Sequence, residues 1–338
     1  MVTITASAPV RVCDAGGWTD TWFATEGLVC SIAVGPGARV VVQLGDEPGP
    51  VTLELAATGE RYAFSPAVDA PGRHPLLEAA LGAHRFAPGR AAHVRVAAAV
   101  PPGSGTGTSA AVVVALLAAI GAARHDAIEP IALARAAHAV EIGLGLQSGV
   151  QDQYAAAFGG CNAIRVDAYP DAAVEPIAVT PALVDALDAQ LVTVYLGRPH
   201  ASSTVHERVI ARLERDGTAG VKLQPLRDAA AAAAAALAAG DLAAYGDALI
   251  ANTAAQAALD GALVSDDARA LFDIAHRHGA CGWKVNGAGG DGGSVTIVAA
   301  SDPERRASMI DAIDRVTHWQ RLPLRLSPDG ARAIRVPA

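Results

Sequence analysis

The segment Pro101–Ala111 carries three glycines at alternate positions, followed by two hydroxyl residues. Closely spaced glycines let backbone N–H groups turn inward, and the start of a following helix adds the positive end of its dipole. Such a loop can hold phosphates, while a plain glycine-rich turn is the alternative. The candidate phosphate-binding residues are Pro102, Gly103, Ser104, Gly105, Thr106, Gly107, Thr108 and Ser109, of which the last two can also offer a hydroxyl to Mg²⁺.

Two well-known phosphate loops do not fit this segment. A Walker loop needs a Lys directly before Ser or Thr, and Thr108 occupies the last glycine position of a dinucleotide fingerprint. A second loop, Lys284–Gly293, does satisfy G-x-G-x-x-G, but the β-branched residues that follow it predict a strand, not a helix. We therefore expect a hairpin or a turn near the substrate, which argues against a dinucleotide-dependent dehydrogenase.

Two acidic residues, Glu141 and Asp152, follow the first loop on predicted helices. Asp152 is expected in the first turn of its helix, where the dipole favours the ionised carboxylate. An ionised Asp can accept a proton from an attacking hydroxyl, and a separate Glu can hold Mg²⁺. A helix-capping Asp and a solvated Glu are the alternative, and the spacing alone does not decide between them.

The N-terminal segment combines Pro9, Arg11 and the run Gly16-Gly17-Trp18-Thr19-Asp20-Thr21. Glycines followed by alternating aromatic and polar residues are typical of a loop that contacts a small molecule. Asp20 could bind two neighbouring hydroxyls of a sugar, although Asp also commonly caps a turn. Trp18 and Trp22 could flank a sugar ring or pack in the core.

The elements that must position these residues follow from hydrophobic pattern and turn residues. In the first half, strands are predicted at 2–7, 28–34, 39–44, 51–55 and 94–100, and helices at 109–123 and 130–146. A capping box at Ser148–Gln151 predicts a short helix that ends at Gly159-Gly160. In the second half, strands are predicted at 189–195, 294–299 and near 333–336, and helices at about 204–215, 226–257, 266–278 and 303–316.

Composition excludes several classes of protein. The chain has 338 residues and a formal net charge of −8, which argues against a nucleic-acid partner. Four scattered cysteines and one His276-x-His278 pair lack the spacing of a disulfide framework or a zinc site. Neither a signal peptide nor a membrane-spanning run is predicted, so the expected location is the cytoplasm.

At this point the sequence resembles the GHMP kinases, which include galactokinase, homoserine kinase and mevalonate kinase. Three motifs match in order, at Pro9–Asp20, Pro101–Ala111 and Lys284–Gly293. A fourth stretch, Gly149–Gly160, is similar to the segment that carries the family's catalytic Asp. The run Gly-Gly-Trp-Thr-Asp-Thr is most similar to fucokinase and the heptose kinases.

The resemblance implies an α+β fold of two domains, with an N-terminal α/β domain at 1–180, a C-terminal ferredoxin-like domain at 181–338, and the site between them. It implies ATP and Mg²⁺ as cofactors and a sugar as the small-molecule partner. The implied catalytic residues are Asp152 as base and Arg11 as the group that steadies it. The implied metal-side residues are Ser109 and Glu141, and the implied substrate-binding residues are Gly17, Trp18, Thr19, Asp20, Gly289 and Gly290.

Three departures from the family pattern qualify this expectation. Thr106 replaces an apolar residue of the phosphate loop, and Asp291 interrupts the third motif's glycines. Gly17 and Trp18 stand where galactokinase has an acid and a histidine, which argues against galactose. The predicted activity is transfer of a phosphoryl group to a sugar hydroxyl, the anomeric one. A kinase of another polyol or an isoprenoid alcohol, and a non-catalytic sensor of ATP and sugar, are the alternatives.

Overall fold

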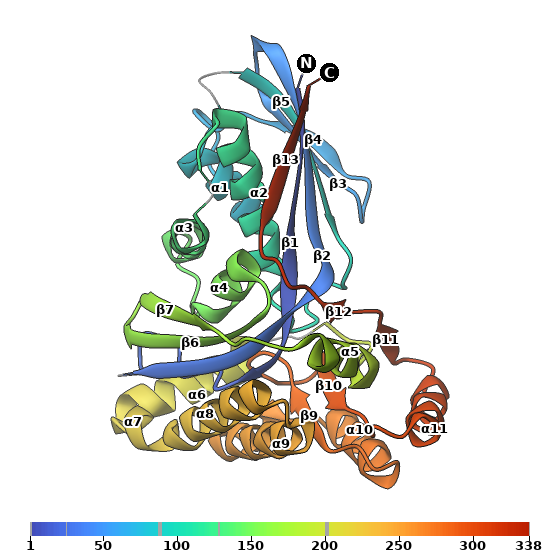
Figure 1. Ribbon diagram of the computed structural model, residues 1–338. Coiled ribbons are helices and arrows are strands. Elements are labelled where there is room, and N and C mark those ends of the chain that lie inside the picture. Colours follow the sequence, from blue (N-terminus) through green and yellow to red (C-terminus); the bar gives the residue numbers. More distant parts are fainter. Residues whose placement is uncertain (1, 25, 87–89, 128, 200–202, 338) are drawn as a thin grey trace.

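The computed structural model describes residues 2–24, 26–86, 90–127, 129–199 and 203–337, arranged around two β-sheets (Figure 1). Its strands are β1 (Val2–Ala15), β2 (Gly27–Pro48), β3 (Val51–Leu55), β4 (Arg61–Phe64), β5 (Arg90–Ala98), β6 (Cys161–Ala168), β7 (Asp171–Pro176), β8 (Leu191–Tyr195), β9 (Gly282–Val285), β10 (Ser294–Val298), β11 (Gln320–Leu322), β12 (Arg325–Leu326) and β13 (Arg332–Pro337). Its helices are α1 (Pro75–Ala83), α2 (Thr108–Arg124), α3 (Pro130–Gly143), α4 (Gln151–Phe158), α5 (Pro181–Gln190), α6 (Ser203–Asp216), α7 (Ala219–Lys222), α8 (Gln224–Ala239), α9 (Leu242–Leu259), α10 (Asp266–Arg277) and α11 (Pro303–Asp314), with a 3₁₀ turn at Gly261–Leu263.

The first sheet is built on two long antiparallel strands, β1 and β2. Its main order among the described residues is β13-β1-β2-β5-β3-β4; β6 and β12 also pair with β2, and β7 pairs with β6. The helix α2 packs on β1 and β2, and its Ala, Val, Leu and Ile side chains are almost all buried because α1, α3 and α4 cover its other side. This packing places the N-terminus of α2 beside the end of β1 (Figure 1).

The second sheet has the strand order β11-β8-β10-β9, and all of its described pairings are antiparallel. Numbered from β8, this order is 4-1-3-2, which a βαββαβ chain adopts in the ferredoxin-like arrangement. A hydrophobic cluster of its own joins this sheet to α10 and α11 through Leu271, Ala275, Ile297, Met309 and Ile313. The predicted α+β fold is therefore confirmed.

The last strands of the chain return to the first sheet. β13 pairs with β1 from Val2↔Pro337 to Ser7↔Arg332, so the two ends of the chain lie side by side (Figure 1). β12 pairs with β2 near Gly35. The division near residue 180 stays a prediction.

Most predicted elements agree with the structure, but three predictions were wrong in detail. The strands predicted at 28–34 and 39–44 are one strand, β2. The helix predicted at 226–257 is two, because Gly240 is left-handed with φ 72° and Asp241 caps the next helix by accepting the N–H groups of Ala243 and Ala244. The capping box is not formed, since the Ser148 hydroxyl donates to the Gly149 carbonyl and α4 has no side-chain cap from its own N-cap residue.

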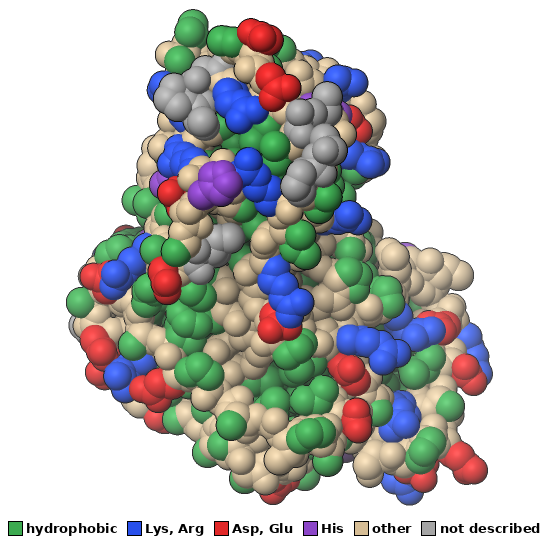
Figure 2. Space-filling model, turned by 45° about the horizontal axis from the view of Figure 1, so that its top comes forward, with side chains coloured by type: hydrophobic (Ala, Val, Ile, Leu, Met, Phe, Trp, Pro, Cys, Tyr) green, Lys and Arg blue, Asp and Glu red, His purple; other side chains and the backbone are tan. Residues whose placement is uncertain are grey.

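Several elements were missed, among them α1, α5, α7, β4, β6, β7, β11 and β12. Among the described residues, none of the helices combines the length and the apolar character needed to cross a bilayer. On the face shown in Figure 2, basic and acidic side chains are interspersed.

Candidate active site

A cleft of about 1350 Å³ brings the predicted motifs together. Its walls come from β1, the turn after β1, the loop before α2, the C-terminal end of α3, the start of α4, and α6. Of the residues predicted from sequence, the walls include Arg11, Trp18, Asp20, Pro102, Gly103, Ser104, Gly105, Thr106, Gly107, Thr108, Ser109, Glu141 and Asp152. Residues far apart in the sequence thus share one cavity.

The first glycine loop leads directly into α2. Gly103, Gly105 and Gly107 have φ values of 69°, 73° and 70°, a left-handed conformation that glycine adopts without strain. Gly107, the N-cap of α2, has no side chain to cap the first N–H groups of this helix, and Thr108 and Ser109 of its first turn line the cleft. The loop therefore has the geometry of an anion site.

Hydroxyl groups stabilise this loop from inside. The hydroxyls of Ser104 and Thr106 are 2.7 Å apart, and Thr108 follows at 3.2 Å from Thr106. Ser104 and Thr106 are buried. Thr106, the departure from the family pattern, thus finds its polar partners within the loop.

Asp152 lies in the first turn of α4, beside this loop. The Arg11 Nε donates to its Oδ1 at 2.9 Å, and the Arg11 Nη1 donates to the Gly105 carbonyl. Burial alone would lower the pKa of Arg11, but Asp14 and Asp152 more than offset this and raise it. Arg11 therefore stays charged and holds the Asp152 carboxylate against the phosphate loop.

Asp20 caps a helix and also lines the cleft. Its Oδ2 accepts the Gln151 N–H at 2.9 Å and so caps α4 from a distant part of the chain. A Cβ on Gly149 would lie 2.2 Å from the same oxygen, so a side chain there would displace the Asp20 carboxylate. Burial raises the pKa of Asp20 to about 6.

Glu141 and Ser109 also line the cleft, and each carries side-chain oxygen. Glu141 is buried and accepts the Gln153 Nε2 at 2.8 Å, and burial raises its pKa to about 7. Ser109 stands in the first turn of α2. Among the described residues no group of three or more His, Cys, Asp or Glu side chains could hold a metal ion.

An apolar wall flanks Asp20. Trp18 is 6% exposed and its Nε1 donates to the Ala288 carbonyl at 3.2 Å, while its ring meets His206 edge-on. Phe23 and Ile210 continue this wall. His206 and Ile210 were not predicted as site residues, because no motif on the predicted helix at 204–215 indicated which of its faces meets the site.

Two predicted substrate residues lie behind the wall. A Cβ on Gly17 would be 3.1 Å from Asp14 Oδ2, so Gly17 faces that buried carboxylate. The Thr19 hydroxyl donates to the Gly16 carbonyl at 2.7 Å and accepts the Leu28 N–H at 3.0 Å. Both residues shape the turn that presents Trp18.

The third glycine loop connects β9 and β10 as a hairpin, one of the two predicted alternatives. Gly289 and Gly290 do not reach the cleft wall, because they pack on the Leu263 carbonyl, to which the Gly290 N–H donates at 2.9 Å. Asp291 is 76% exposed and lies 3.8 Å from Arg198. The wall is instead formed by the preceding Gly287 and Ala288.

One end of the cleft was not predicted. Glu78 of α1 accepts the backbone N–H groups of Gly72, Arg73 and His74 and the hydroxyl of Tyr62. This anchors the segment before α1, whose Arg73 and His74 line the cleft. No motif signals it, because the organising contact is one carboxylate binding a turn.

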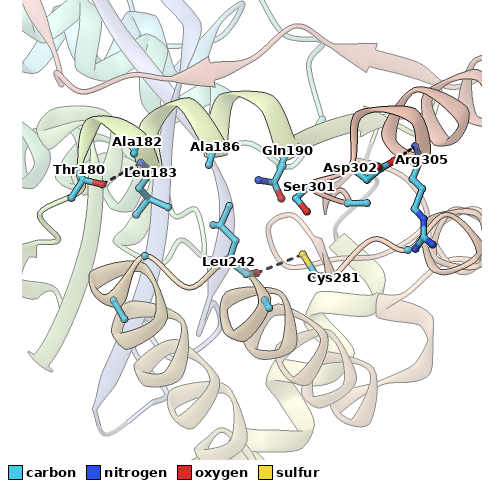
Figure 3. Close-up of a pocket in the computed structure, with 15 residues that line it drawn as sticks. Thr180, Ala182, Leu183, Ala186, Gln190, Leu242, Cys281, Ser301, Asp302 and Arg305 are labelled. Atoms are coloured by element: carbon cyan, nitrogen blue, oxygen red, sulfur yellow. Dashed lines mark hydrogen bonds between the residues drawn. The ribbon is translucent and has the colours of Figure 1, made fainter.

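A second cavity of about 830 Å³ lies between α5, the α8–α9 junction and the start of α11 (Figure 3). Its polar groups serve the fold. Thr180 caps α5, Asp302 caps α11, and the Cys281 thiol lies 3.6 Å from the Leu242 carbonyl. We assign this cavity no chemistry.

The chain is similar in sequence to known kinases. Residues 75–160 match the GHMP kinases N terminal domain. The bifunctional fucokinase/GDP-fucose pyrophosphorylase of Arabidopsis thaliana is 24% identical over 319 residues, which cover 88% of this chain and 30% of that protein. The D-glycero-alpha-D-manno-heptose 7-phosphate kinase of Campylobacter jejuni is 25% identical over 215 residues, which cover 63% of this chain and 62% of that protein. Each match therefore spans less than two thirds of the relative.

Solved structures share the fold along the whole chain. A D-glycero-D-manno-heptose 1-phosphate kinase from Bacteroides thetaiotaomicron is 21% identical with a TM-score of 0.76, covering 99% of this chain and 100% of that one. Lactococcus lactis galactokinase in complex with galactose is 17% identical with a TM-score of 0.74, covering 98% and 95%. The chain thus carries a GHMP kinase N-terminal domain within a GHMP kinase fold.

Proposed function

We propose that this chain is an ATP- and Mg²⁺-dependent sugar kinase that phosphorylates the anomeric hydroxyl of a fucose- or heptose-like sugar. The observation that carries the proposal is the Arg11–Asp152 pair, held at 2.9 Å against the left-handed glycines of the phosphate loop. A proton acceptor next to an anion site is what phosphoryl transfer to an alcohol requires.

The side chains divide the work. ATP supplies the phosphoryl group, and Mg²⁺ offsets charge on its phosphates. The N–H groups of Gly105, Gly107 and the first turn of α2 hold phosphate oxygens. The oxygen of the sugar hydroxyl bonds to phosphorus while the bond from phosphorus to the leaving ADP oxygen breaks. Asp152 accepts the proton that this hydroxyl loses. Arg11 fixes Asp152 and adds positive charge nearby.

Ser109 and Glu141 are proposed to hold Mg²⁺. Both are oxygen donors on the wall of the same cleft, which is the ligand chemistry this ion prefers. Burial of Glu141 raises the free energy of its ionised form, and a cation would relieve that cost.

Asp20 and the apolar wall are proposed to bind the sugar. The Asp20 carboxylate can accept hydroxyl hydrogens, and Trp18, Phe23 and Ile210 offer an apolar surface. This combination favours a sugar with an apolar edge. The names of the relatives, a fucokinase and two heptose phosphate kinases, support a sugar acceptor.

The test is ADP release from ATP with a panel of free sugars and sugar phosphates, with Mg²⁺ or with a chelator. We expect metal-dependent ADP release with one sugar class, and a ³¹P spectrum of a phosphate on the anomeric carbon. Binding of ATP and sugar without any ADP release would replace the kinase by a sensor, and a phosphate on another carbon would overturn the anomeric assignment.

A further inference from the structure

Asp14, near the end of β1, has no part in the transfer described above. Its side chain is fully buried, and both carboxylate oxygens accept the Gly287 N–H, at 3.0 and 3.1 Å. Its Oδ1 lies 3.7 Å from Arg11 Nη1 and 3.9 Å from Lys284 Nζ. One buried carboxylate thus touches residues of both sheets.

Lys284, on β9, accounts for part of this arrangement. It is 1% exposed and donates to Gln256 Oε1 at 3.0 Å and to the Val285 carbonyl. Burial lowers the pKa of Lys284, and Asp14 opposes this. A buried ammonium group without a carboxylate is costly, and the ion pair that Lys284 makes in the described part of the chain is with Asp14.

The charges form an alternating series, Asp152–Arg11–Asp14–Lys284. Arg11 is 4% exposed; its Nε donates to Asp152, and its Nη1 donates to the Gly105 carbonyl with the Asp14 carboxylate 3.7 Å away. With Asp14 neutral, Lys284 would be an unpaired cation beside the guanidinium and would repel it. The orientation of Arg11, and through it that of Asp152, therefore depends on Asp14.

The hydrogen bond between Asp14 and the Gly287 N–H also supports the phosphate loop, because Gly287 packs against Gly105 of that loop. A Cβ on Gly287 would lie 3.0 Å from the Gly105 carbonyl, and one on Gly105 would lie 2.8 Å from the Asn286 carbonyl. The two glycine loops thus pack backbone to backbone. Since Asp14 holds the Gly287 N–H, it also holds the surface on which Gly105 rests.

We propose that Asp14 is a positioning residue for phosphoryl transfer, which aligns Asp152 through Arg11 and supports the phosphate loop through Gly287. This inference rests on the proposed kinase function. It assigns Asp14 an effect on kcat, whereas a charge partner that serves only Lys284 would affect stability alone.

The test compares D14N, K284M and the double variant D14N/K284M with the wild type. D14N keeps the shape and removes the charge, and we expect kcat to fall about 10- to 100-fold with both KM values within about threefold, because misplaced groups lose rate more than binding. Tm should also fall, since Lys284 is left unpaired. D314N, which removes the exposed partner of Arg321, is the matched control and should behave as the wild type.

The double variant separates the two roles. Without the ammonium group, Tm should recover, but kcat should stay low because Arg11 still lacks the negative charge of Asp14 beside its Nη1. Recovery of kcat together with Tm would overturn the proposal, as would wild-type kcat in D14N.

A readout independent of turnover is the Arg11 Nε to Asp152 Oδ1 distance in a crystal structure of D14N/K284M. Positioning predicts that this contact lengthens or breaks. A contact kept near 2.9 Å, with Gly287 unmoved, would overturn the Asp14 proposal. This result is independent of the kinase proposal, because it needs no ADP release by the wild type.

Discussion

Two glycine-rich loops pack against each other in this molecule, and their glycines have different roles. In the loop before α2, glycines open the backbone toward the cleft, and residues 102–109 all line it. In the loop between β9 and β10, Gly289 packs on the Leu263 carbonyl and on Gln256, and the Gly290 N–H donates to the same carbonyl. A glycine pattern thus indicates a backbone with positive φ angles. The element that follows it decides whether that backbone meets a ligand or another chain segment.

The largest expected effect concerns the base beside the first loop. D152N keeps the shape of the side chain but removes the proton acceptor, so kcat should fall about 10²- to 10⁴-fold. ATP affinity should change little, because the loop N–H groups are intact. Steady-state kinetics with ATP titration tests this, and near-normal turnover would remove Asp152 from the mechanism.

Paired glycine substitutions test the comparison itself. In G107A the new Cβ meets Asp152 Cγ at 3.0 Å with φ +70°, so kcat should fall about 10- to 100-fold. In G289A the Cβ meets the Leu263 carbonyl at 2.3 Å, so Tm should fall by at least about 2 °C while KM for ATP is kept. Since both glycines have a positive φ, Tm can fall in both variants, but an equal fall in kcat would abolish the distinction between the loops.

Asp20 separates sugar binding from helix capping. D20A loses both the cap of α4 and the sugar contact, so we expect about 1 kcal/mol lower stability and at least about tenfold lower kcat/KM for the sugar. Asn caps as well as Asp, so D20N should keep Tm and lose only kcat/KM. A D20N enzyme with unchanged sugar kinetics would make Asp20 a cap and nothing more.

The metal-side residues should give smaller effects. S109A and E141Q are each expected to raise the Mg²⁺ concentration for half-maximal rate by about three- to tenfold, because each removes one oxygen ligand or its charge. Ser301→Ala and Glu175→Gln, outside the cleft, are the matched controls. An unchanged Mg²⁺ requirement would return Ser109 and Glu141 to structural roles.

The smallest effect is a pH dependence. Because burial raises the pKa of Asp20 to about 6, kcat/KM for the sugar should fall as the pH drops below that value. D20N should lack this acidic limb of the pH–rate profile. The pKa lies above the value near 4 of an unfolded chain, so protonated Asp20 stabilises the fold below pH about 4, and this contribution is lost as pH rises through about 6. Urea unfolding at several pH values checks the sign, and a limb retained in D20N would assign it to another group.

Local sequence determined much of this protein. Turn glycines, β-branched runs and prolines at helix starts specify strands and helices through near-neighbour chemistry, so β3, α2, α3 and the β9–β10 hairpin were predicted closely. The same locality explains the failure at Gly240, where a single left-handed residue divides a continuous alanine pattern into two helices. It also explains the missed α1, whose turn depends on Glu78 and not on a motif.

Only the tertiary structure decided how the site is assembled. Arg11 and Asp152 are 141 positions apart, Asp20 and Gln151 are 131 apart, and Asp14 and Gly287 are 273 apart. Such pairs form because two sheets and α2 pack in one arrangement that buries their apolar faces, and the polar groups left between them must then satisfy one another. No periodicity in the sequence encodes those partners, which is why the network around Asp14 emerged only from the fold.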